Sequence, residues 1–156
     1  MKAILPLLLV ALAAGQSCND GTASKEANRD TVELVTEPAL PKPDTRCYAW
    51  RNNKDTVLLK VTLTDTSASG DLLYNFFEKD DNNGTIQGVL RKDTLLADYT
   101  FQSEGTISVR QVAFVLSDSS AVEGYGGVDE KNGRQVFKDL SKLKFQGVGL
   151  KREPCQ

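Results

Sequence analysis

Residues 56–64, TVLLKVTLT, alternate between apolar and polar side chains. Only Leu58 breaks the alternation, and the other polar positions are threonines or lysine. A period of two residues predicts a β-strand with one buried face. The residues of this predicted buried face are Val57, Leu59, Val61 and Leu63.

Similar short stretches follow along the chain, and residues typical of tight turns separate them. Asn-Gly occurs at 83–84 and again at 132–133, and this pair favours hairpins because both residues tolerate positive φ. The sequence therefore predicts turns, and the expected positions are 81–84, 92–93, 103–105, 117–120 and 132–133. In the Gly-rich stretch 120–128 we expect a bent strand.

Together these stretches predict an all-β fold. About eight short strands in roughly 110 residues are typical of an antiparallel meander, which hides its two edges by closing into a small lipocalin-like barrel. The segment 134–143 is the one candidate helix, because Val136, Leu140 and Leu143 have helical spacing. A short strand followed by a turn fits the same segment.

The first residues are typical of an export signal. Lys2 precedes an apolar run, Ala3–Ala14, which is shorter than the roughly 20 residues that a membrane-spanning helix needs. Residues 1–17 are therefore predicted to be a signal peptide. Two cleavage patterns fit, the Ala-Leu-Ala at 11–13 and a lipobox-like sequence, GQSC, at 15–18.

The number of cysteines favours the lipobox. The chain has three, Cys18, Cys47 and Cys155, so one thiol is left over after a disulfide forms. A free thiol is a liability in an exported protein. If Cys18 carries a lipid, the other two can form one disulfide. The first and last strands of a closed meander are neighbours, so a Cys47–Cys155 bridge is expected in an oxidising compartment.

Residues 18–44 are predicted to be a lipidated, disordered tether. Three of the five prolines fall at 38, 41 and 43, and apolar residues are too few to offset the entropy of ordering the segment. Thr31 lies in an Asp-Thr-Val triplet that resembles the O-glycosylation sequon of Bacteroidota envelope proteins. Asn19, rather than Asp, follows Cys18, which favours the outer over the inner membrane. The barrel domain is expected at 45–156.

Composition excludes several classes of function. The net charge is -2, so no nucleic-acid partner is expected, and the absence of histidine removes His-based triads and metal sites. The acidic turn at 78–84 fails the EF-hand pattern, because Lys79 and Leu90 occupy positions that require carboxylates. We find no motif for a metal or cofactor, and an enzyme is the less favoured class.

A polar cluster inside the barrel is the main candidate site. Arg110 shares a strand face with Val112 and Phe114, so its side chain is a candidate to point inward. A buried arginine needs a carboxylate partner, and the candidates are Glu104, Glu123 and Glu78. This cluster is interpreted either as the mouth of a small cavity or, more simply, as an interior salt bridge or a bulge that returns Arg110 to solvent.

The segment 74–114, YNFFEKDDNNGTIQGVLRKDTLLADYTFQSEGTISVRQVAF, resembles a group of small uncharacterised lipoproteins of the Bacteroidota envelope. The resemblance extends over about 47–155 and includes the signal that ends at Cys18. It implies a location in the cell envelope and adds no catalytic residue.

Three hypotheses for function follow from the sequence. The first is an envelope lipoprotein whose non-catalytic barrel binds a small apolar ligand or an envelope component. The second is a structural or accessory module with a protein partner. The third is a carboxylate-dependent hydrolase that uses Glu78 and Glu104. A cavity of several hundred Å3 favours the first, and a filled barrel with an exposed apolar patch favours the second.

Overall fold

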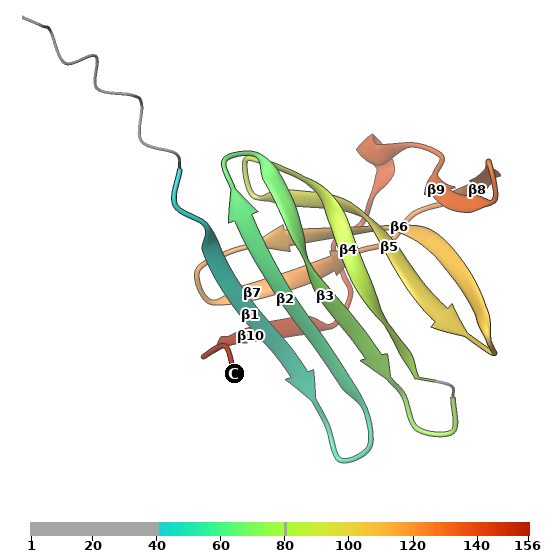
Figure 1. Ribbon diagram of the computed structural model, residues 1–156, viewed down its shortest axis with the longest axis horizontal. Helices are drawn as coiled ribbons and strands as arrows, with labels where there is room; N and C mark the ends of the chain where they lie inside the picture. Colours follow the sequence, from blue (N-terminus) through green and yellow to red (C-terminus); the bar gives the residue numbers. More distant parts are fainter. Residues whose placement is uncertain (1–40, 80) are drawn as a thin grey trace, which may run out of the picture. The chain divides into compact units, whose positions relative to one another are not determined.

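The computed structural model describes residues 41–79 and 81–156, and these residues form ten strands and one short 3-10 turn (Figure 1). The strands are β1 (Asp44–Arg51), β2 (Thr56–Thr64), β3 (Ser67–Asn75), β4 (Asn82–Arg91), β5 (Thr94–Ser103), β6 (Thr106–Leu116), β7 (Ser120–Gly124), β8 (Val128–Lys131), β9 (Arg134–Phe137) and β10 (Gly149–Glu153). The 3-10 turn, η1, spans Leu140–Lys142.

Eight of the strands close into an antiparallel barrel, which confirms the predicted fold. The order around the barrel is β5-β4-β3-β2-β1-β10-β7-β6, and pairing of β5 with β6 completes the ring. The predicted neighbourhood of the first and last strands is also present, since Cys47, Tyr48 and Ala49 of β1 pair with β10. Closure leaves less unpaired strand edge than an open sheet would present.

The hairpin β8–β9 lies outside the ring, between β7 and β10 in the chain, and Figure 1 shows it to one side of the barrel. It touches the barrel ladder through the parallel pair Arg110 and Gln135. The candidate helix at 134–143 is strand β9 followed by η1, so the strand-and-turn interpretation of this segment is correct. Asp139 caps η1 by accepting a hydrogen bond from the Ser141 amide.

Side chains fill the interior of the barrel. The alternation predicted at 56–64 is present in β2, whose Val57, Leu59, Val61 and Leu63 all lie in the buried core. Tyr48 lies across one end, and its hydroxyl donates to the Ser117 carbonyl at 2.9 Å. The buried core contains Tyr48, Val57, Leu59, Val61, Leu63, Ala68, Leu72, Tyr74, Ile86, Leu95, Ala97, Tyr99, Val112, Phe114, Leu116, Ala121 and Leu150.

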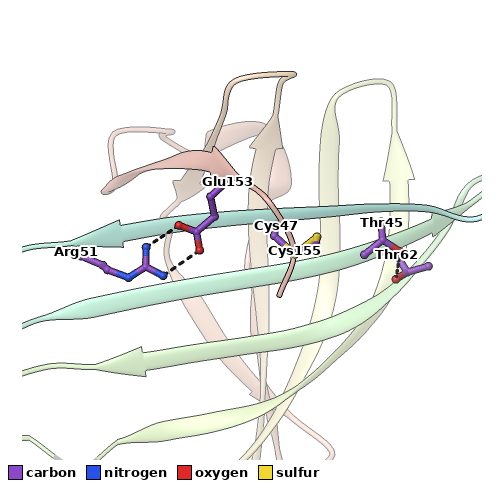
Figure 2. The surroundings of a disulfide bond; sticks show 6 residues. All are labelled: Thr45, Cys47, Arg51, Thr62, Glu153 and Cys155. Carbon is purple, nitrogen blue, oxygen red and sulfur yellow. Dashed lines mark hydrogen bonds and ion pairs between the residues drawn. A yellow bond between two sulfur atoms is a disulfide. The ribbon is translucent and has the colours of Figure 1, made fainter.

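The disulfide between Cys47 and Cys155 is formed, with its Cα atoms 5.2 Å apart and 108 positions apart in sequence. Figure 2 shows it beside two further contacts, the ion pair between Arg51 and Glu153 and the hydrogen bond between the Thr45 and Thr62 hydroxyls. Arg51 makes a two-pronged ion pair with Glu153, at 2.7 and 2.9 Å. The predicted disulfide is therefore confirmed.

One predicted turn was placed wrongly. Asn82, Asn83 and Gly84 belong to β4, where they pair with β3, and the chain reverses before them. Gly84 faces inward, and a Cβ there would lie 2.0 Å from the Thr100 carbonyl oxygen on β5. The glycine therefore permits two strands to approach closely, a different role from the positive φ that the Asn-Gly pair suggested.

The other predicted turns are present. Lys92, Glu104 and Asn132 adopt positive φ values of 49–58° at the tight connections. The predicted signal peptide, Cys18, Thr31 and the tether up to residue 40 lie outside the described residues. Residues 41–43 carry no regular secondary structure, and β1 begins at Asp44. Within the described part of the chain, no helix is long and apolar enough to cross a membrane.

Candidate functional site

Strand pairing in the barrel is incomplete beside the first half of β6. On one side β6 pairs with β5 along its length, but on the other it pairs with β7 only over 113–116. Closer to the start of β6, the described residues supply a single pair, between Arg110 and Gln135 of β9. The wall is therefore open on both sides of this one pair. We call this end of the barrel, which also holds the turn at 104–105, the Arg110 end.

Arg110 points into the barrel at this opening. Its guanidinium carbon lies 5.0 Å from the ring centre of Tyr74 and 5.5 Å from the ring centres of Tyr99 and Phe101. Cross-strand pairing explains this contact, because Tyr99 is the direct partner of Arg110 on β5. The Tyr99 and Phe101 rings are stacked with their centres 4.7 Å apart. The cation is thus held against the faces of three aromatic rings, an arrangement that stabilises a partly desolvated charge.

Among the described residues Arg110 makes no ion pair, and its Nε is buried without a hydrogen-bond partner. The predicted interior salt bridge is therefore not a direct contact here. The planar guanidinium of arginine carries five N–H donors in a fixed geometry, and burying a donor without an acceptor costs folding free energy. A buried donor of this kind can be satisfied by a water, an ion or a ligand.

Glu123 is the buried carboxylate of the same end of the barrel, and it is 6% exposed. It accepts two hydrogen bonds, from the Tyr74 hydroxyl at 2.5 Å and from the Tyr125 hydroxyl at 2.8 Å. Tyr74 comes from β3, on the far side of the barrel from the β7 residue Glu123. We call Arg110, Glu123, Tyr74, Tyr99 and Tyr125 the Arg110 cluster.

The tyrosines of the cluster are held in their protonated form. Burial, followed by the charge of Glu123 and its hydrogen bond, raises the pKa of Tyr74 far above its ordinary value. The same causes raise the pKa of Tyr125. Burial raises the pKa of Tyr99 to about 12, although the positive charge of Arg110 opposes this shift. At neutral pH these hydroxyls are therefore donors. Those of Tyr74 and Tyr125 stabilise the carboxylate of Glu123, whereas that of Tyr99 donates to the Asn82 carbonyl at 2.7 Å.

Two pockets flank the Arg110–Gln135 pair. The larger, of about 310 Å3, is a groove between the start of β6 and the β8–β9 hairpin. Lining residues from β6 include Ile107, Ser108 and Arg110, and those from the hairpin include Glu130, Arg134 and Gln135. The smaller, of about 120 Å3, lies between Arg110, Glu123 and Phe137. We call the larger pocket the β6 groove, and Arg110 is reached from both pockets.

The structure does not bring all the predicted acidic residues together. Glu123 lies in the cluster, whereas Glu78 and Glu104 are exposed, at positive φ in the connections that follow β3 and β5. Neither of these two lines the β6 groove. The sequence pattern alone missed Arg134 and Gln135. The only sequence signal near them was the Asn132–Gly133 turn, which predicts a hairpin but not the strand against which the hairpin packs.

The Arg110 cluster is compatible with ligand binding. Arg110 and Glu123 supply one charge of each sign, while the tyrosine hydroxyls are already engaged as donors. In the described part of the chain, no group of three or more Cys, Asp or Glu side chains is arranged to hold a metal ion. The chain matches no model of a known protein family, no curated protein and no solved structure.

Proposed function

We propose that this protein is an envelope lipoprotein, anchored by lipid on Cys18, whose non-catalytic barrel binds a small ligand with an apolar body in the β6 groove. The observation that carries the binding proposal is the groove itself. It is about 310 Å3 in volume, at the lower end of typical ligand pockets, and it opens onto Arg110, which makes no ion pair with another described residue. The interior of the barrel is filled by the core, so the ligand sits at the wall.

Apolar surface at the groove supports this proposal. Ile107 is 73% exposed on β6, and the partly buried Phe101, the cross-strand partner of Ser108 on β5, also lines the groove. These two side chains give the groove apolar surface beside its charged residues. The anchor and the tether proposed at 18–44 would hold this groove clear of the membrane surface, where a ligand from the periplasm or a neighbouring envelope component can reach it.

The binding proposal is tested with Nile red, a neutral apolar dye whose fluorescence rises in an apolar site. We expect wild-type protein to enhance the fluorescence, and Ile107→Glu to lose most of the enhancement because a charge replaces the apolar wall of the groove. Val89→Glu is the matched control, since Val89 is 38% exposed on β4 and does not line the groove. Equal loss in both variants, or no enhancement by wild type, would contradict the proposal.

The anchor is tested by the intact mass of protein purified from membranes. A chain that begins at Cys18 and carries an added acyl mass is the expected result, and Cys18→Ser should abolish both the mass increase and membrane retention. A soluble mature form that begins near Ala14 would contradict the proposed lipid anchor on Cys18. The same membranes, separated by density, should place the protein with outer-membrane markers, in keeping with Asn19 after the anchor.

A second function, that of an accessory module with a protein partner, is favoured by the filled interior. The start of β6 adds a specific observation, because residues 106–109 are paired by described residues on one side only. Such an edge can accept a partner strand. If Nile red does not bind in the groove, the filled barrel and this edge make the accessory module the better proposal.

A further inference from the structure

We propose that the ligand of the β6 groove is an amphipathic organic acid, and that its carboxylate or phosphate is held by the guanidinium of Arg110. This inference rests on the proposed binding function and adds the chemical class of the ligand. It follows from the charge at the inner wall of the groove, from the donors that point there, and from the apolar residues nearer to solvent.

The inner wall of the groove carries a cation that no described residue neutralises by contact. Glu123, the buried carboxylate of the cluster, directs its two oxygens to Tyr74 and Tyr125. It makes no ion pair with Arg110. The guanidinium therefore keeps its donors available, in a place where water is partly excluded and a charge-assisted hydrogen bond is strong.

The other charges of the groove leave this position open to an anion. Arg134, on the hairpin wall, is already paired with Asp98 at 2.5 Å. Glu130 lies on the same outer wall and is exposed. Glu130 is thus at the solvent side of the groove and Arg110 is at its inner side. This arrangement of charges orients an anionic head group inward.

The aromatic rings hold the fork of Arg110 in place before any ligand arrives. Contact with Tyr74, Tyr99 and Phe101 limits the motion of the guanidinium plane, so less entropy is lost when it binds. A planar, pre-oriented fork matches a carboxylate or phosphate in two-pronged geometry. The apolar body of the ligand then lies along Ile107 toward solvent.

The test uses isothermal titration of the protein as the cell exports it, with four probes: benzoate, phenyl phosphate, benzyl alcohol and inorganic phosphate. We expect the two aromatic acids to bind more tightly than the neutral alcohol. Arg110→Gln should weaken the acids by about ten- to a hundredfold, the usual effect of losing hydrogen bonds to a charged group, and leave the alcohol unchanged. Preference for benzoate identifies a carboxylate head, and preference for phenyl phosphate identifies a phosphate head.

Two variants keep the result interpretable. Arg110→Lys retains the charge without the fork, so its affinity for the acids should fall between those of wild type and Arg110→Gln. It also gives a second comparison with wild type if Arg110→Gln folds poorly. Arg91→Gln removes an exposed arginine from β4, outside the groove, and should bind all four probes like wild type. Inorganic phosphate alone should bind weakly, because it lacks the apolar body.

The failures are distinguishable. If benzyl alcohol binds as tightly as benzoate, and Arg110→Gln changes neither, the acid inference is overturned while the binding proposal stands. If none of the four probes binds and Nile red is not enhanced, both are overturned. If Arg91→Gln weakens the acids as much as Arg110→Gln does, the effect is one of overall charge and the assigned site is overturned.

Discussion

Replacing Cys155 with Ser should lower the free energy of unfolding by about 2–5 kcal/mol under oxidising conditions, the usual cost of losing a native disulfide from a small exported domain. The bridge joins positions 108 residues apart, so its loss releases nearly the whole domain from a constraint on the unfolded chain. For a domain of about 110 residues this corresponds to a fall in melting temperature of about 10 °C or more.

The structure explains why other contacts do not replace the bridge. Strand β10 pairs with β1 only from Cys47 to Ala49 and with β7 only over 149–151. The ion pair between Arg51 and Glu153 is exposed to solvent, and pairs of this kind contribute little to stability. The disulfide is therefore the strongest tie on the C-terminal strand that completes the barrel.

The measurement is a thermal melt with and without reductant. Wild type and Cys155→Ser should differ in oxidant and coincide in reductant, while Cys18→Ser should melt like wild type in both. Cys47→Ser should reproduce the loss, which shows that the pair and not one thiol is responsible. Coinciding melts of wild type and Cys155→Ser in oxidant would mean that the bridge does not form in solution.

The strands were predictable because their signals are local. In β2 the alternation at 56–64 follows from having one face in the core and one in solvent, and a barrel repeats that condition on every strand. The turns at Lys92, Glu104 and Asn132 were predictable for a similar reason, since each is a short connection with its own positive φ. The closing disulfide followed from the topology and from the number of cysteines.

The Arg110 cluster was only half predictable, because its contacts are set by register. The sequence indicated that Arg110 faces inward, but its aromatic neighbours come from β3 and β5. Sequence distance suggested Glu104 as a partner, yet that residue sits in a turn where its side chain is exposed. The mistaken turn at Asn82 had the same cause, since whether an Asn-Gly pair lies in a turn or a strand depends on the partner strand.

Replacing Glu123 with Leu should lower the free energy of unfolding by about 2–4 kcal/mol. The substitution removes the acceptor for two tyrosine hydroxyls. The hydroxyl of Tyr74, a residue only 4% exposed, is then left without a partner, and a buried unsatisfied donor costs about 1–3 kcal/mol. Tyr125 is 53% exposed, so its hydroxyl can turn to water at little cost.

A set of variants separates these contributions. Glu123→Gln keeps an acceptor and should cost less than Glu123→Leu. Tyr74→Phe should cost more than Tyr125→Phe, because it withdraws a donor from the buried side of the carboxylate. Combining Tyr74→Phe with Glu123→Leu should cost less than the sum of the two single changes, since no unpaired donor then remains. Additive costs in urea unfolding would show that the hydrogen bond contributes little.

The same hydrogen bond predicts how stability depends on alkaline pH. The pKa of Tyr74 is raised in the folded protein, so its stabilising contribution is complete below the unfolded value of about 10 and is lost as pH rises toward the folded value. Above about pH 10 the unfolded chain releases this proton and the folded chain keeps it. Stability then falls by about 1.4 kcal/mol per pH unit for that residue.

Tyr74→Phe should therefore show a shallower loss of stability than wild type between about pH 10 and 12, measured by urea unfolding at each pH. Parallel curves for the two proteins would show that the Tyr74 hydroxyl is not held protonated by burial and by Glu123.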